Sequence, residues 1–301
     1  MTIDRQQTAP HKSKLFCFGF GYVAGTLARQ LDTAAFEVAG TNRAVEAGVP
    51  GAVALTSFNG AEHGAGVADL LAGATHVLVS VPPGADGDLV LRHHADDLAQ
   101  LVTLKWIGYL STIGVYGDAD GDWIDETCMI QPKSERGRRR AAAEAEWRAF
   151  GKLHGKRVEI FRLPGIYGPG RSALDAVKAG TARRIVKQGQ VFNRIHVADI
   201  AAVLARAMTL AAQGRAVPFD TYNVVDDEPG SPQDVVAYAA DLLQMPAPPE
   251  QPFETADLSP MARSFYGESK RVRNDRMKAA FGISLQYPTY REGLRAIAAA
   301  E

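Results

Sequence analysis

The sequence predicts an α/β protein with a doubly wound parallel sheet and a small C-terminal lobe. Three observations support this fold class. Short apolar runs alternate with segments of helical spacing up to about residue 163, as in consecutive βαβ units. A glycine-rich turn joins the first apolar run to the first helical segment. After about residue 165 the alternation gives way to clusters of glycine and proline, which indicates a different arrangement for the second half.

Each element follows from the period of its apolar residues. Buried strands of a parallel sheet are short, continuous apolar runs, whereas helices repeat their apolar residues every three or four positions. The expected strands cover residues 14–18, 36–40, 75–80, 105–110 and 158–163. The expected helices of this half cover residues 22–31, 67–71, 89–101 and 140–153.

The second half carries two helix-start signatures. Ser231, Pro232 and Asp234 occupy the N-cap, N1 and N3 positions of a helix expected to run to about Leu243. Thr289 with Glu292 repeats the cap pattern before a last helix. Another helix is expected near residues 198–211, and residues 246–252 form a proline-rich linker. We therefore expect a flexible tail over 1–12, a dinucleotide-binding domain over 13–165 and, over 166–301, mainly a substrate lobe with some elements returning to the sheet.

Composition narrows the classes of function. A formal net charge of -1 gives no broad field for nucleic acid or a membrane surface. No apolar run approaches the roughly 20 residues that span a bilayer. Two cysteines, Cys17 and Cys128, make no disulfide framework, which fits a reducing compartment. We expect a cytoplasmic protein with a small-molecule substrate and neither a nucleic-acid nor a membrane partner; a homodimer is left open.

The glycine-rich turn has the spacing of a dinucleotide-binding loop. Gly19, Gly21 and Ala24 match G-x-G-x-x-G/A between a strand and a helix. The first glycine permits the tight turn, the second lets the backbone approach a pyrophosphate, and the third small residue allows close helix–strand packing. This context predicts a Rossmann fold, although the motif alone would also fit a mere tight turn. The expected cofactor contacts in the loop are Gly19, Phe20, Gly21, Tyr22 and Val23.

The end of the second strand favours NADP over NAD. NAD sites usually place an acidic residue there to bind the ribose 2′-hydroxyl. This chain has Asn42 at that position, followed by Arg43, so the repulsion toward a 2′-phosphate is missing and a guanidinium is supplied. The alternative is that Arg43 only solvates a loop, and NAD stays open as the cofactor.

The chain resembles the extended type of the short-chain dehydrogenase/reductase superfamily, the NAD-dependent epimerase/dehydratase family. Four stretches carry the resemblance: the glycine loop and residues 110–117, 162–170 and 194–200. By this resemblance Thr112 would polarise the substrate oxygen, and Ser111 would lie against the nicotinamide side. Leu163 and Pro164 would form a wall beside the nicotinamide. Val81 and Pro82 would lie near the cofactor's ribose and adenine.

The active-site tetrad of that family is incomplete here. Its Tyr-x-x-x-Lys motif aligns with Arg136 and Arg140, and no tyrosine lies between Gly117 and Tyr167. Arg140 could hold ribose hydroxyls, but the pKa of an arginine is too high for Arg136 to donate a proton near neutral pH. The sugar-nucleotide-binding asparagine of many members aligns with Gly165. The pattern resembles the atypical subgroup, which keeps the glycine loop and loses the tetrad.

Other polar residues have a structural and a chemical interpretation. His93 and His94 are expected on a solvated helix face rather than in a metal site, because no further ligand completes the spacing. His196 and Asp199 are expected to cap a helix rather than to catalyse. Tyr116 could replace the missing acid only if it pointed into the cleft.

Two functions of different class are compatible with these residues. The first is an NAD(P)-dependent oxidoreductase or epimerase with altered acid/base residues, in which Thr112 orients the substrate. In that case Arg136 and Arg140 would bind a carboxylate or phosphate of a small or nucleotide-linked substrate. The second is a non-catalytic NADP-binding sensor or regulatory protein. The missing tyrosine favours the second function, and the size of the C-terminal lobe favours the first.

Overall fold

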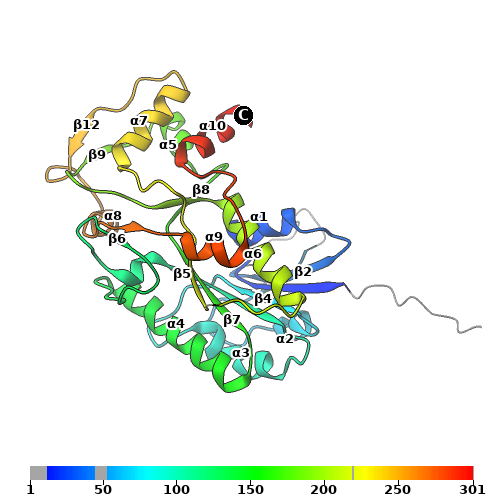
Figure 1. The fold of residues 1–301 in the computed structure, drawn as a ribbon. Coiled ribbons are helices and arrows are strands. Elements are labelled where there is room, and N and C mark those ends of the chain that lie inside the picture. The colour runs from blue at the N-terminus through cyan, green and yellow to red at the C-terminus, as the bar shows by residue number, and fades with distance from the viewer. Residues whose placement is uncertain (1–11, 45–52, 219, 301) are drawn as a thin grey trace, which may run out of the picture.

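A computed structural model describes residues 12–44, 53–218 and 220–300. Its centre is a seven-stranded parallel sheet with the strand order β11-β7-β5-β4-β1-β2-β3 (Figure 1). The order reverses beside β1, so β2 and β4 flank it. The strands are β1 (Ser13–Phe18), β2 (Phe36–Asn42), β3 (Ala54–Ser57), β4 (His76–Val79), β5 (Trp106–Thr112), β7 (Val158–Leu163) and β11 (Thr221–Asn223).

Helices cover both faces of this sheet and bury two separate apolar cores. One face carries α1 (Tyr22–Gln30), α6 (Val197–Ala212) and α9 (Asp275–Phe281). The other face carries α2 (Val67–Leu71), α3 (Leu89–Gln100) and α4 (Glu135–His154). Cys17 on β1 is buried in the first core, as its apolar surroundings predict. Apolar side chains on both faces explain why the strand sequences are continuous apolar runs.

The C-terminal half adds a smaller lobe beyond the carboxyl ends of the strands (Figure 1). Its own core joins α5 (Ala173–Lys178), α7 (Pro232–Leu242) and α10 (Tyr290–Ala300). The remaining elements are short: 3-10 helix η1 (Ile113–Tyr116), α8 (Pro260–Phe265), and three two-stranded parallel sheets. These sheets pair β8 (Gly165–Tyr167) with β10 (Arg194–His196), β9 (Arg184–Val186) with β12 (Glu250–Pro252), and β6 (Trp123–Ile124) with β13 (Arg271–Val272).

The element pattern agrees with the sequence to within a few residues at most ends. Among the expected elements the largest difference is α4, which begins at Glu135, five residues before the expected start, with Ser134 as its N-cap. Strand β3 of the central sheet was not expected from the sequence. The proline-rich segment 246–252 ends in the short strand β12 rather than in linker alone. No helix of the described residues is long and apolar enough to cross a membrane. The division at residue 165 stays a prediction, and most of the expected tail lies outside the described residues.

The expectation for His94 was wrong. Its side chain is fully buried, whereas we expected a solvated helix face. The buried residues of α3 are Val90, His94 and Leu98, which recur every four positions and so share one face of the helix. His94 therefore lies on the apolar face of α3, and His93 beside it is half-buried.

Candidate functional site

The turn after β1 is fixed by Gly19. Its φ of 87° lies in the left-handed region, and an added Cβ would stand 2.5 Å from the Ser80 side-chain oxygen. The Gly19 N–H donates to the Thr41 hydroxyl at 3.0 Å, and the Phe20 N–H donates to the Thr41 carbonyl at 2.6 Å. The loop is thus tied to the end of β2, and only glycine fits its first position.

Gly21 faces open space at the beginning of α1. A Cβ added there would meet no atom within 4 Å. Gly21 is the N-cap of α1, no side chain caps the helix, and its first turn holds no acidic residue. Backbone N–H groups at a helix N-terminus attract anions, and the space beside Gly21 would admit one. This arrangement fits a dinucleotide pyrophosphate. Ala24 is buried, as close helix–strand packing requires.

The other loop residues differ in their surroundings. Phe20 is half-buried and packs against the core, and the side chain of Val23 is buried. The Tyr22 hydroxyl donates to the Pro169 carbonyl at 3.0 Å, which links the loop to the segment after β8. Only the backbone of Val23 is therefore available to a ligand, while Tyr22 joins the two lobes.

Asn42 and Arg43 end β2 beside the glycine loop. Asn42 is half-buried and Arg43 is exposed. The Arg43 carbonyl accepts a hydrogen bond from the Ser57 hydroxyl at 3.2 Å, but its guanidinium has no ion pair with the described residues. The next residues, 45–52, lie outside the described part of the chain. Within the described part of the chain, the Arg43 guanidinium is thus unpaired at the strand end where a 2′-phosphate would be recognised.

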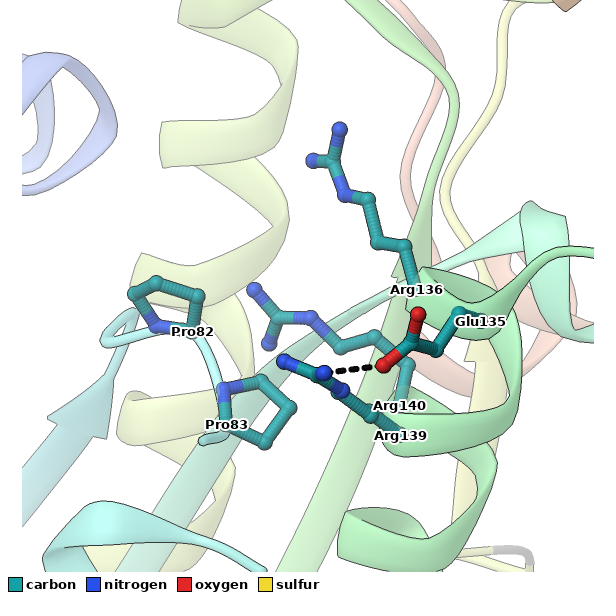
Figure 2. Close-up of a pocket in the computed structure, with 6 residues that line it drawn as sticks. All are labelled: Pro82, Pro83, Glu135, Arg136, Arg139 and Arg140. Atoms are coloured by element: carbon teal, nitrogen blue, oxygen red, sulfur yellow. Dashed lines mark hydrogen bonds and ion pairs between the residues drawn. The ribbon is translucent and has the colours of Figure 1, made fainter. Parts of the chain in front are cut away.

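A pocket of about 290 Å³ lies where the loop after β4 faces the first turns of α4 (Figure 2). Val81, in the same loop, lies beside the glycine loop, because a Cβ on Gly19 would stand 3.4 Å from its backbone nitrogen. The pocket is lined by Pro82, Pro83, Glu135, Arg136, Arg139 and Arg140. It brings together Pro82 and the two arginines that the sequence singled out. Ser111, Leu163 and Pro164 are not among its lining residues.

The three arginines of the pocket have different partners. Arg139 forms an ion pair with Glu135, which neutralises one of the cations. Arg140 is buried, and its Nη1 donates to the Leu110 carbonyl at 2.7 Å and to the Tyr109 hydroxyl at 3.0 Å. Arg136 is exposed and has no hydrogen bond or ion pair with the described residues. The pocket therefore keeps a positive charge that a bound anion could share.

Thr112 and Leu163 end neighbouring strands, since they are paired in register between β5 and β7. The Thr112 hydroxyl oxygen accepts the Gly114 N–H at 3.1 Å and caps η1. Thr112 therefore has a structural role at the end of β5, and its hydroxyl proton stays available to another acceptor. Leu163 is buried and Pro164 is half-buried after it.

Ser111 points into a buried polar network instead of the cleft. Its hydroxyl donates to Glu144 Oε1 at 2.6 Å, and the Arg162 guanidinium binds both oxygens of the same carboxylate. Arg162 also donates to the Tyr116 hydroxyl at 2.8 Å, which in turn donates to Asn223 Oδ1 at 2.8 Å. The Ser111 side chain is thereby committed to this network.

Solved structures show what this arrangement is similar to. No family model and no curated protein matches the chain. A conserved protein of unknown function from Silicibacter pomeroyi is 45% identical, covers 96% of this chain and 99% of its own, and has a TM-score of 0.83. A candidate NAD-dependent epimerase/dehydratase from Methylobacillus flagellatus is 26% identical over 96% and 98% of the two chains, with a TM-score of 0.73. Structural neighbours of the chain are members of the NAD-dependent epimerase/dehydratase family, which supports the same family for this chain.

More distant structures share the fold. The UDP-glucuronic acid 4-epimerase from Bacillus cereus, solved with UDP-glucuronic acid and NAD, is 14% identical over 95% of this chain and 98% of its own, with a TM-score of 0.74. In the present chain, the glycine loop, β5 and α4 meet at the carboxyl ends of the central strands. Ligands bind at this edge in open α/β sheets.

Sequence reasoning missed the role of Arg162. Its motif was recognised only by resemblance, yet the side chain joins Glu144 on α4 to Tyr116 on η1. A buried arginine needs a buried acid, and Glu144 is the one that α4 turns inward. Its position four residues after Arg140 was the available signal. Because Tyr116 is buried and bonded on both sides, it does not supply an acid to the cleft.

His196 and Asp199 of the last motif both bind backbone groups, but only His196 caps a helix, as the sequence predicted for the two of them. The Nδ1 atom of His196 accepts the Ala198 N–H at 3.2 Å and caps α6. Asp199 accepts the backbone N–H groups of Gln286 and Tyr287, at 2.7 and 3.1 Å, and so fixes the segment before α10. Both side chains are committed to backbone groups, which explains their place in the motif without catalysis.

Proposed function

We propose that this chain binds a nicotinamide dinucleotide, with NADP preferred, and acts as an oxidoreductase or epimerase on a small or nucleotide-linked anionic substrate. The observation that carries the proposal is the open space beside Gly21 in front of the uncapped N-terminus of α1. When bound, the nicotinamide would accept or donate a hydride. The structural neighbours support the same cofactor class, since several proteins of this fold were solved with NAD.

The preference for NADP rests on Arg43. Its exposed guanidinium has no ion pair with the described residues, and Asn42 removes the carboxylate that would repel a 2′-phosphate. A guanidinium binds phosphate oxygens through paired hydrogen bonds. Arg43 would therefore hold the 2′-phosphate, and NAD would lose that contact.

The class of substrate follows from the charge of the pocket. Glu135 pairs with Arg139, so Arg136 and the remaining donors of Arg140 face the pocket without an acidic partner. A carboxylate or phosphate on the substrate would satisfy Arg136. Arg140, held in place through Nη1, would contact the nicotinamide ribose. Thr112 would donate its hydroxyl proton to a substrate oxygen.

The absence of a tyrosine at the position of the family's general acid supports the non-catalytic function as a second candidate. The position of the family's tyrosine is Arg136, and Tyr116 is buried in the Arg162 network. A general acid or base usually contributes roughly 10²–10⁴-fold to the rate. A protein that senses NADP without turning over a substrate would have no need of one.

Two measurements separate these functions. The full chain is first titrated with NADPH and NADH by calorimetry, and we expect binding with tighter NADPH. NADPH oxidation is then screened against small carbonyl compounds that carry a carboxylate or phosphate, with wild type and Arg136→Ala in parallel. Turnover that Arg136→Ala reduces supports the enzyme. Binding without turnover of any compound supports the sensor, and absence of binding to both cofactors contradicts the proposal.

A further inference from the structure

A histidine–aspartate cluster lies between α3 and the segment that joins β3 to α2. His94 and Asp97 come from α3, and His63 comes from the joining segment. Asp97 Oδ2 lies 2.8 Å from Nδ1 of His94 and 2.8 Å from Nε2 of His63. One potential ligand atom from each residue lies within 4.8 Å of the others. It is the one such group among the described residues that could hold a metal ion.

Apolar packing does not explain why the buried side chain at position 94 carries the two ring nitrogens of a histidine. Its side chain is fully buried, between the rings of Phe18 and Phe58 at centroid distances of 5.2 and 5.0 Å. Its Nε2 has no hydrogen-bond partner, so Asp97 is the sole polar partner of the ring in the described structure. A leucine would fill the same apolar position of α3 without this desolvation cost. The imidazole is thus aimed at Asp97 and His63.

We propose that His63, His94 and Asp97 form a binding site for Zn²⁺ or a similar divalent transition metal. Two imidazoles and one carboxylate are a ligand set that zinc accepts, with water in the fourth position. Zinc ligands at bond lengths of about 2.0–2.2 Å stand about 3.3 Å apart in a tetrahedron. The 2.8 Å contacts therefore need to open by only about half an ångström.

Access and ligand state fit this assignment. The His63 side chain is 54% exposed and Asp97 is 29% exposed, so an ion can enter from solvent on that side. Without metal, each ring places an N–H toward the shared carboxylate oxygen. On metal binding each neutral ring moves that proton to its other nitrogen and offers the lone pair, so no redox change is needed.

The bound ion would connect two segments that are distant in the sequence. His63 and Asp97 are 34 positions apart, and the metal would fix the connection between β3 and α2 to the middle of α3. A ligand that binds only the folded state stabilises it, by an amount that grows with the logarithm of the free ligand concentration relative to Kd. The site would then stabilise the face of the sheet that α2 and α3 cover.

The test is a calorimetric titration of the chelator-treated full chain with Zn²⁺, together with the visible absorption of bound Co²⁺. We expect one equivalent of metal, tetrahedral Co²⁺ bands and a rise of the thermal midpoint with Zn²⁺. His63→Ala and Asp97→Asn should each weaken Zn²⁺ binding at least tenfold and abolish the Co²⁺ bands. His154→Ala, which removes an exposed histidine outside the cluster, should bind metal like wild type.

The choice of variants keeps the test decisive. His63 is exposed, so His63→Ala should stay folded, which circular dichroism checks independently of metal. His94 is not replaced, because a cavity in the core would unfold part of the chain for reasons unrelated to metal. The proposal is overturned if wild type binds no Zn²⁺, or if both His63→Ala and Asp97→Asn bind it with unchanged affinity and stoichiometry.

Discussion

Arg140 donates its Nη1 hydrogen bond to the Leu110 carbonyl at 2.7 Å, which fixes α4 to the end of β5. The same nitrogen donates to the Tyr109 hydroxyl, so one side of the guanidinium is committed to the sheet. Arg136 lies one helical turn earlier and has no such anchor in the described structure. The Arg140 guanidinium is thus held by the sheet, whereas that of Arg136 is not bound by any described residue. Arg136 is therefore the better candidate for a substrate contact.

Arg136→Lys should raise KM for the substrate found in the screen by roughly tenfold and change kcat less. Lysine keeps the charge but loses the planar fork that binds a carboxylate or phosphate through two bonds. Steady-state kinetics measures both constants. Arg138→Lys is the matched control, because Arg138 is exposed on the same turn and does not line the pocket. Equal effects of the two variants would remove Arg136 from the substrate site.

Arg43→Ala should weaken NADPH binding roughly tenfold and leave NADH binding nearly unchanged, since only NADPH has a 2′-phosphate. Calorimetric titration of wild type and variant with both cofactors measures the four affinities. NADH is the internal control for any disturbance of the loop. A variant that loses both cofactors equally, or neither, would show that Arg43 only solvates the loop.

Tyr116→Phe should destabilise the fold without removing activity. The hydroxyl accepts a bond from Arg162 and donates one to Asn223, so its loss leaves two buried groups unsatisfied at a cost of about 1–3 kcal/mol. Burial raises the pKa of Tyr116 to about 12, which also makes it a poor acid near neutral pH. Urea unfolding measures the loss of stability. If the folded variant lost turnover by 10²-fold or more, Tyr116 would be the missing acid after all.

The free energy of unfolding should fall as pH is lowered from about 6.5 to 4, in part because of His76. Burial lowers the pKa of His76 from 6.5 to about 4, so in this window the unfolded chain binds a proton that the folded chain does not. A shift of this size corresponds to a loss on the order of 3 kcal/mol once both forms are protonated.

His76→Gln tests that assignment. Glutamine can still donate to the Met208 carbonyl, which accepts from His76 Nε2 at 3.1 Å, but it does not titrate. Urea unfolding of wild type and variant between pH 4 and 7.5 should therefore show a shallower slope for His76→Gln. Identical slopes would mean that other groups produce the acid lability.

Local sequence predicted five of the seven strands of the central sheet, because each is a short, largely apolar run. Strand β3 was missed because it is short and has no buried residue. The glycine loop was also predictable, since Gly19 needs a left-handed backbone and Gly21 faces open space. The ion pair between Glu144 and Arg162 was not predictable in this way, because the two residues lie 18 positions apart on different elements. The spacing of His94 from Val90 and Leu98 indicates a buried position on α3. The polarity of histidine favoured an exposed position instead, and the spacing was the better guide.

The measurement that tests the central claim most directly is NADPH titration of Gly21→Val beside Gly25→Ala. Gly21 has a φ of -105°, which valine adopts, and its added side chain would occupy the proposed pyrophosphate space. At Gly25 an added Cβ would make only ordinary contacts, the nearest at 3.6 Å. We predict that both variants fold, that Gly25→Ala binds NADPH like wild type, and that Gly21→Val shows no measurable binding. A folded Gly21→Val with wild-type affinity would contradict a dinucleotide site at this loop.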